Sequence, residues 1–251
     1  PLATFLRISR KLGSSWKFST PAVVTAFCFQ GYHQVALCKT IHSLEHRLDA
    51  VGEVGFLGFG FGDGLFETLI VKRDVPQFLS LHLDRLAAGL QVLAFPDCVD
   101  RASHCISLAA SELRTHDWSV LRLTVTRGGA PRGYAAPDNA TPRMVVTAAP
   151  LNQDRQLPAA PVALDWAELR WSSQPLLAGI KHLNRLEQVL VANQLRRGEA
   201  DELVVLDQQG HVCSASAANL FLVESGRLLT PVLETCGIAG TRRRLILEQL
   251  A

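Results

Sequence analysis

A polar segment bounded by prolines divides this chain of 251 residues into two parts. The segment, PLNQDRQLPAAP at residues 150–161, shows neither the period of an amphipathic helix nor that of a strand. Helix-like and strand-like patterns occur both before it and after it. The sequence therefore predicts an α+β (mixed α/β) fold in two lobes. We expect an N-terminal α/β lobe at residues 51–149, a linker at 150–161 and a C-terminal lobe at 162–251.

The expected N-terminal lobe mixes strands with helices. Residues 65–81, LFETLIVKRDVPQFLSL, predict two strands around a short KRDV turn. Leucines at helical spacing predict a helix over residues 82–95, and a second helix is expected at residues 100–116. Alternating and β-branched residues predict further strands at residues 119–129 and 143–150.

The expected C-terminal lobe begins with a loop that becomes a helix. Residues 177–195, LAGIKHLNRLEQVLVANQL, change from loop to an amphipathic helical pattern. Its apolar face is predicted to comprise Leu183, Leu186, Val189, Leu190 and Leu195. Residues 201–231 predict a meander of strands, and another helix is expected to begin near Thr241.

The composition excludes several classes of protein. Hydrophobic residues make up 48% of the chain and charged residues 19%, which indicates a folded protein. The net charge is +2 and no basic stripe is interleaved with aromatic residues, so we expect no nucleic-acid partner. No apolar run reaches the roughly 18 residues of a membrane helix, so no membrane association is expected. The six cysteines lack metal-ligand spacing, which predicts reduced thiols in a cytoplasmic protein without a metal site.

Both ends of the chain are unusual. Residues 1–44 contain no Asp or Glu but several Lys, Arg and Ser residues, a composition that resembles an organelle-targeting leader. We favour instead an atypical N-terminal extension, non-native or disordered, over residues 1–50. The last helical pattern is still running at Ala251, so the expected C-terminal lobe is truncated.

Four features could carry chemistry, and spacing alone leaves each of them open. Lys181 stands near a helix start, where a cation opposes the macrodipole, and is either a Schiff-base nucleophile or a surface lysine. Arg85 is either a phosphate ligand or a surface arginine. The glycines before Thr241 indicate either an anion site or a plain helix start. The glycine run at residues 55–64 is followed by a strand pattern, so we expect a glycine-rich turn and no dinucleotide site.

Taken together, these motifs resemble one enzyme family. FGDGLFETL, HLDRL, TRGGAPRGY, GIKHLNRLEQV, ADELVVLD, ANLFLV and TPVLETCGIAG occur in the order seen in fold-type IV enzymes that use pyridoxal 5'-phosphate (PLP). The resemblance covers about residues 59–250, and KHLNRLEQV is most similar to the 4-amino-4-deoxychorismate lyase branch. It implies a two-lobed fold with PLP in the interdomain cleft, a C-terminal PLP-binding lobe and a homodimer.

The resemblance also implies roles for individual residues. Lys181 matches the lysine that bonds covalently to PLP, Arg85 the arginine that grips its phosphate, and Ile238 the residue that packs on its ring. The family's phosphate cradle matches Gly240, Thr241 and Arg242, and its substrate-facing residues match Thr68, Arg132 and Tyr134.

Ser214 departs from the family pattern. Most members carry a glutamate there, which pairs with the pyridine nitrogen of PLP and keeps it protonated. A serine hydroxyl can hydrogen-bond to that nitrogen but brings no charge. We therefore expect a weaker electron sink, which should hurt transamination more than an elimination driven by aromatisation.

The resemblance implies a lyase that converts the small molecule 4-amino-4-deoxychorismate to 4-aminobenzoate and pyruvate, a step toward folate. Lys181 would serve as general base and, as an ammonium, as the acid that protonates pyruvate, with Thr68 and Tyr134 as other candidates for that acid. An aminotransferase acting on D- or branched-chain amino acids is the alternative within the family. A non-catalytic scaffold is the alternative outside enzymes.

Overall fold

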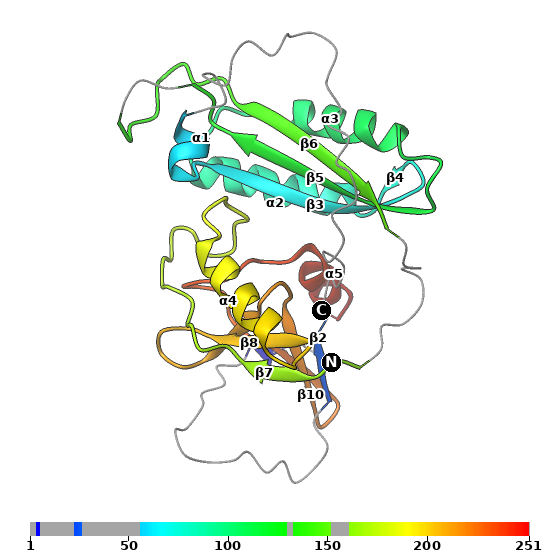
Figure 1. Ribbon diagram of the computed structural model, residues 1–251, viewed down its shortest axis with the longest axis vertical. Coiled ribbons are helices and arrows are strands. Elements are labelled where there is room, and N and C mark those ends of the chain that lie inside the picture. Colours follow the sequence, from blue (N-terminus) through cyan, green and yellow to red (C-terminus); the bar gives the residue numbers. More distant parts are fainter. Residues whose placement is uncertain (1–3, 6–22, 27–55, 130–132, 152–160, 251) are drawn as a thin grey trace. The chain divides into compact units, whose positions relative to one another are not determined.

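The computed structural model describes residues 4–5, 23–26, 56–129, 133–151 and 161–250 (Figure 1). These residues form two compact units, each described by itself. The first, which we call the lysine unit, comprises the described residues 56–129, 133–151 and 180–184. The second, which we call the cradle unit, comprises residues 4–5, 23–26, 161–179 and 185–250.

The lysine unit is built on an antiparallel sheet with strand order β4-β3-β5-β6, against which α2 and α3 pack (Figure 1). Its elements are α1 (Phe56–Phe61), β3 (Gly64–Lys72), β4 (Val75–Pro76), α2 (Leu79–Val92), α3 (Val99–Ser111), β5 (Trp118–Thr126) and β6 (Arg143–Pro150). The two predicted helices and the strands β3, β5 and β6 are confirmed, because each has the hydrophobic period of its class. The second strand predicted within residues 65–81 is wrong beyond Pro76, since β4 ends there and α2 begins at Leu79.

The two faces of this sheet differ. Successive side chains of a strand point to opposite faces, so β3 presents one set of residues to the helices and another set away from them. Leu65 and Glu67 face α2 and are at most 2% exposed. Phe66 and Thr68 lie on the other face, where Thr68 is opposite Arg122 of β5. Polar and aromatic side chains therefore gather on the face that α2 does not cover.

The cradle unit contains two small sheets and two helices. One sheet has strand order β7-β8-β9 and the other β1-β11-β10-β2. The elements are β1 (Thr4–Phe5), β2 (Val23–Ala26), β7 (Leu164–Trp166), α4 (Leu186–Arg197), β8 (Glu202–Leu206), β9 (Val212–Ala215), β10 (Leu220–Glu224), β11 (Arg227–Thr230) and α5 (Thr241–Leu250). The predicted meander is confirmed as β8 to β11, and the predicted last helix as α5.

Residues 180–184 group with the lysine unit, although we placed them in the C-terminal lobe. The amide of Phe66 donates to the carbonyl of Lys181 over 2.9 Å, and the amide of Leu183 donates to the carbonyl of Gly64 over 2.9 Å. These main-chain bonds continue the ladder of β3 and hold the segment beside that strand.

Other predicted boundaries lie mainly outside the described residues. Of the expected extension at residues 1–50, the structure describes β1 and β2, which pair with β11 and β10. Of the expected linker at 150–161, it describes only the ends. The extension, the linker and a cofactor cleft between the lobes stay predictions.

The apolar face predicted for residues 177–195 is wrong at three of its five positions, whereas Leu195 packs against a buried core cluster. Leu186, Val189 and Leu190 are 72%, 51% and 51% exposed, whereas Val191 is 1% exposed. Val191 packs in a core cluster that includes Trp171 and residues of β8. The helix therefore buries the side that carries Val191, because that side meets the hydrophobic residues of the β7-β8-β9 sheet.

The glycine run forms a short helix before it turns. We expected a turn over residues 55–64, but residues 56–61 form α1, and Gly62 then adopts a positive φ of 69°. β3 follows directly, so the strand–glycine–helix order of a dinucleotide site does not occur here. A Cβ atom at Gly64 would lie 2.4 Å from the carbonyl oxygen of Val125, so glycine permits the close approach of β3 to β5.

Among the described residues, no helix combines the length and the apolar character needed to cross a bilayer. The same part of the chain contains no group of three or more His, Cys, Asp or Glu side chains placed to hold a metal ion.

Candidate active site

Lys181 lies in the segment that extends beside β3. Its Nζ is 4.2 Å from the ring centroid of Phe66, and its carbonyl accepts the amide of Phe66. We expected the lysine at the mouth of the helix, but α4 begins only at Leu186. The ring of Phe66 lies within cation–π distance of the amine.

Arg85 makes a two-pronged ion pair with a buried glutamate. Its Nε donates to Oε1 of Glu67 over 2.8 Å, and its second terminal nitrogen donates to Oε2 over 2.5 Å. The ring Nδ1 of His82 lies 2.7 Å from the same Oε2. His82 and Arg85 are three residues apart on α2, so both side chains reach the same point of β3. Such bidentate pairing holds a guanidinium in one orientation.

The charge of Glu67 is maintained by these partners. Burial raises the pKa of the Glu67 carboxyl, but the hydrogen bonds and positive charges of Arg85 and His82 together bring it below its usual value. The carboxylate is 1% exposed and therefore depends on those partners for its solvation. Loss of Arg85 would leave the buried carboxylate with His82 as its remaining partner in this cluster.

A second arginine lies on the opposite face of β3. The Cζ atom of Arg122 is 3.8 Å from the ring centroid of Phe66, the same ring that meets the amine of Lys181. Thr68, which the family resemblance assigns to substrate, is the cross-strand neighbour of Arg122. This face therefore brings two cations and a hydroxyl together around one aromatic ring.

The predicted substrate loop is described only in part. Tyr134 is 84% exposed, and its ring centroid lies 4.6 Å from that of Phe61 in α1. Arg132 lies outside the described residues. The roles of both residues stay predictions.

In the cradle unit, Asn219 holds the loop that leads into α5. Its Nδ2 donates to the carbonyl of Ile238 over 2.9 Å, and its Oδ1 accepts the amide of Gly240 over 3.0 Å. A Cβ atom at Gly240 would lie 2.1 Å from that Oδ1, so only glycine fits. The loop is also bonded to Gly179, whose amide donates to the carbonyl of Gly237 over 3.0 Å.

The predicted phosphate cradle lies at the start of α5. Thr241 is its first residue and is 6% exposed. The first amides of a helix have no carbonyl partner within the helix, which makes such an end a suitable place for an anion. Three arginines follow Thr241, and we expected their charge to need an anion as well.

Two of those arginines have other partners. Arg243 donates to Oγ1 of Thr230 over 3.3 Å and to the carbonyl of Pro231 over 3.0 Å, and burial lowers its pKa. Arg244 pairs with Glu248 one turn later on the helix. Arg242 is the arginine predicted to contribute its amide to the cradle, and that role stays a prediction.

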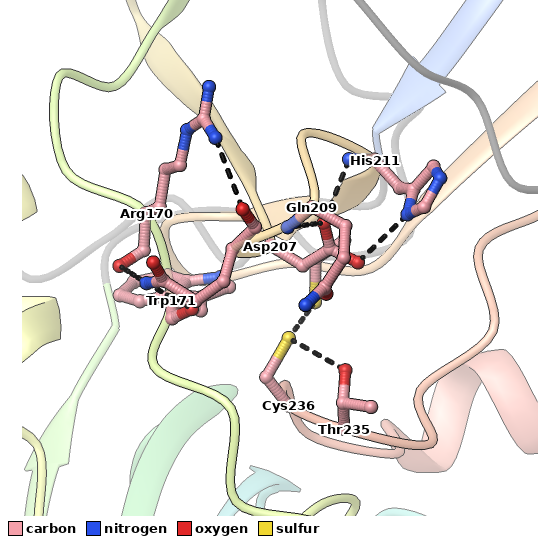
Figure 2. Close-up of polar contacts among 9 residues, drawn as sticks. Arg170, Trp171, Asp207, Gln209, His211, Thr235 and Cys236 are labelled. Carbon is pink, nitrogen blue, oxygen red and sulfur yellow. Dashed lines mark hydrogen bonds and ion pairs between the residues drawn. The ribbon is translucent and has the colours of Figure 1, made fainter.

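Ser214 is engaged in hydrogen bonds inside the cradle unit. Its hydroxyl donates to the carbonyl of Ala215 over 2.8 Å and accepts from Nε1 of Trp171 over 2.9 Å. Trp171 is itself held by the turn after β8, since Nε2 of Gln208 donates to its carbonyl over 3.0 Å (Figure 2). The single hydrogen of Ser214 is already committed, so the hydroxyl can offer a further ligand one lone pair.

Sequence reasoning missed five supporting residues: Glu67, His82, Trp171, Arg122 and Asn219. The alternation of β3 could have assigned Glu67 to the helix-facing side, where a carboxylate needs a cation. The spacing of His82 and Arg85 could have supplied that cation. No sequence signal identified the contact between Trp171 and Ser214, because residues 43 positions apart form it.

The sequence of this chain is similar to those of known enzymes. The model of a family described as amino-transferase class IV matches residues 64–251. The chain is 34% identical over 200 residues to an aminodeoxychorismate lyase of Vibrio harveyi, covering 78% of this chain and 72% of that protein. It is 28% identical over 212 residues to a D-alanine aminotransferase of Listeria monocytogenes, covering 82% and 71% respectively.

A solved structure extends the likeness to three dimensions. The chain superposes on the crystal structure of 4-amino-4-deoxychorismate lyase from Pseudomonas aeruginosa with a TM-score of 0.71 and 35% sequence identity. The match covers 85% of this chain and 76% of that one.

Proposed function

This chain belongs to the class IV aminotransferase family, and from that premise we propose that it is a PLP-dependent lyase acting on 4-amino-4-deoxychorismate. The products would be 4-aminobenzoate and pyruvate. The observation that carries the proposal is the amine of Lys181, held over Phe66 in a chain about one-third identical to proteins named as that lyase.

The residues present fit the cofactor. Lys181 supplies a primary amine for its aldehyde, and Arg85 supplies a guanidinium whose direction Glu67 fixes. Gly240 permits the close approach of Asn219, which holds the loop that leads into α5, and the first amides of that helix are the proposed phosphate ligands. Ile238, with Thr241 and Arg242, completes the proposed set of cofactor contacts.

Bound PLP would supply an electron sink, and the protein would supply binding, orientation and proton transfer. Lys181 removes the proton from the ring carbon that bears the amino group, as general base. The enolpyruvyl group leaves, and aromatisation of the ring drives that departure. The ammonium of Lys181 then returns a proton to the pyruvate carbon. Thr68 and Tyr134 are the other candidates for that acid.

Ser214 suits this reaction. With its hydrogen committed to Ala215, the hydroxyl can accept a bond from a protonated pyridine nitrogen but cannot stabilise that proton with a charge. We propose that the loss of a carboxylate here weakens the sink, and that aromatisation compensates in the lyase reaction. We also propose that the enzyme works as a cytoplasmic homodimer in folate biosynthesis.

The test is a product assay on purified protein incubated with PLP. With 4-amino-4-deoxychorismate, we expect 4-aminobenzoate and pyruvate in equal amounts, and neither product from Lys181→Ala. Amino-group transfer from D-alanine to a keto acid, without 4-aminobenzoate release, would favour an aminotransferase such as the Listeria relative. Neither activity, from protein that does not retain PLP, would favour the non-catalytic scaffold.

A further inference from the structure

Two buried cysteines meet in the core of the cradle unit. The Sγ atoms of Cys213 and Cys236 are 3.3 Å apart, although 23 positions separate the residues in sequence. Neither forms a disulfide here, and they are 3% and 8% exposed. Figure 2 shows Cys236 beside Thr235, whose Oγ1 lies 3.9 Å from its sulfur. The two thiols are therefore already in contact before any bond forms.

The two sulfurs differ in acidity. The hydrogen bond between the two thiols lowers the pKa of Cys236, although burial opposes this. The same hydrogen bond, together with burial, raises the pKa of Cys213. Cys236 is therefore the more acidic of the two thiols and the one that loses its proton more readily. A thiolate is the form that attacks an oxidant, and a neighbouring thiol is the form that resolves the product.

The pair joins two segments that the proposed cofactor site uses. Cys213 lies in β9 directly before Ser214, and Cys236 directly precedes Gly237, Ile238 and the entry to α5. A Cβ atom at Gly237 would lie 2.9 Å from the sulfur of Cys213, so this loop runs directly against β9. Gly237 has φ of 85° and bonds through its carbonyl to Gly179. Movement of Cys236 must therefore move this loop.

We propose that Cys213 and Cys236 form an oxidation site, at which a hydroperoxide converts the dithiol to an intramolecular disulfide. The thiolate of Cys236 attacks one peroxide oxygen and the O–O bond breaks, and the departing hydroxide or alkoxide takes a proton from solvent, giving a sulfenic acid and water or an alcohol. The thiol of Cys213 then attacks that sulfur, the S–O bond breaks and a second water leaves. Two electrons pass from the two thiols to the peroxide, and an external dithiol reverses the change.

The disulfide shifts the cradle loop. A sulfur–sulfur bond is about 2.05 Å long, so the two atoms must approach by more than 1 Å from their separation of 3.3 Å. Because Cys236 directly precedes Gly237, which lies against the sulfur of Cys213, we expect the loop at Ile238 and Gly240 to move with Cys236. We expect weaker PLP binding on the order of tenfold, because positioning groups displaced by about 1 Å lose much of their effect. This second part rests on the proposed function, whereas disulfide formation does not.

Peptide mapping by mass spectrometry tests the site on the intact chain. Hydrogen peroxide treatment, followed by alkylation and digestion, should give a linked Cys213–Cys236 peptide pair that disappears after dithiothreitol. Cys236→Ser should abolish the linked pair. Cys98→Ser should retain it, since Cys98 is buried in another unit and burial raises its pKa. PLP titration of reduced and oxidised protein provides the second readout.

Two results would overturn the proposal. One is recovery of Cys213 and Cys236 as alkylated thiols, or of Cys236 as a sulfinic acid without a link, at a peroxide dose that oxidises the same chain in urea. The other is a linked pair that leaves PLP affinity unchanged, which would overturn the coupling to the cradle loop. Failure of the lyase assay with a linked pair present would count against the proposed function alone.

Discussion

The two units hold their candidate site residues by different forces. In the lysine unit the side chains are charged. Lys181 and Arg122 both contact the ring of Phe66, and Arg85 makes two hydrogen bonds to the buried carboxylate of Glu67. In the cradle unit, Ser214 and Asn219 act through neutral hydrogen bonds. We call these the charged set and the neutral set.

This difference explains how a serine can occupy a position that most of the family gives to a glutamate. Burial raises the pKa of the Glu67 carboxyl, but Arg85 and His82 bring it below its usual value, whereas Ser214 is bonded to an indole N–H and a backbone carbonyl. A carboxylate at position 214 would keep the neutral N–H donor of Trp171. Among the described residues, no charged side chain is hydrogen-bonded to Ser214. Substitutions that remove a charge should therefore have their largest effect in the charged set. Substitutions that change the size of a residue should have their largest effect in the neutral set.

Removal of the Glu67 charge should give the largest effect. Glu67→Gln leaves Arg85 buried without its carboxylate, so the apoprotein should lose about 3 kcal/mol of unfolding free energy and PLP should bind about a hundredfold more weakly. Asp63→Asn is the matched control, because Asp63 makes a comparable forked pair with Arg127. It should lower stability similarly while leaving the PLP dissociation constant nearly unchanged.

The pH dependence of stability provides a further check on this pair. Since the folded pKa of Glu67 lies below 4.5, its contribution is complete above that value and is lost as pH falls through the folded pKa. Wild-type protein should therefore lose more unfolding free energy than Glu67→Gln on acidification below about pH 4.5. Equal losses, or equal PLP affinities for Glu67→Gln and Asp63→Asn, would contradict the positioning role.

A change of shape should have the next largest effect. Gly240→Ala puts a methyl group 2.1 Å from Oδ1 of Asn219, so the loop before α5 must shift. We expect PLP affinity to fall about tenfold, because backbone amides must lie close to the group that they bind. Gly60→Ala, where a Cβ atom meets nothing within 4 Å, is the control. Titration by absorbance compares the two, and unchanged affinity in Gly240→Ala would remove Gly240 from the cradle.

Arg122 should affect substrate binding rather than cofactor binding. 4-Amino-4-deoxychorismate carries carboxylates, and a guanidinium near Lys181 and Thr68 can pair with one of them. Arg122→Gln should raise KM about tenfold with little change in kcat, since uniform binding is lost. Arg73→Gln, which removes an exposed arginine paired with Asp117, should leave steady-state kinetics unchanged. A loss confined to kcat would contradict the binding role.

Ser214→Glu should have the smallest effect on the lyase reaction. A carboxylate strengthens the electron sink but must also be accommodated beside Trp171. We expect lyase kcat/KM to change by less than about tenfold, while conversion of bound PLP to the pyridoxamine form by D-alanine rises. The ratio of the two rates is the measurement. A large gain in lyase activity would show that the missing carboxylate limits that reaction.

Much of the fold could be predicted because hydrophobic period is a local property. β3, α2, β5 and α5 follow from patterns of 9 to 14 residues, and the lysine motif carries its own family resemblance. The buried face of α4 could not be predicted from the helical period. The exposed residues Leu186 and Leu190 fit that period, and so does the buried Val191. Tertiary packing against β8 decides which side is buried.

The supporting contacts of the site were harder to predict for a related reason. Glu67 and Arg85, or Cys213 and Cys236, meet only after strands pair and loops close. Residue types at these positions are compatible with both surface and core. The chemistry-bearing lysine was therefore accessible from sequence, whereas the residues that orient the site came from the structure.

The most direct test of the account is an absorbance spectrum after incubation with PLP and desalting. It compares wild type with Lys181→Ala and with Lys72→Ala, a lysine on β3 whose Nζ lies 5.3 Å from the ring of Trp118. We predict a retained visible band of bound cofactor in wild type and Lys72→Ala, and none in Lys181→Ala. Retention of the band in Lys181→Ala, or its absence from wild type, would contradict the assignment of Lys181 as the residue that holds PLP.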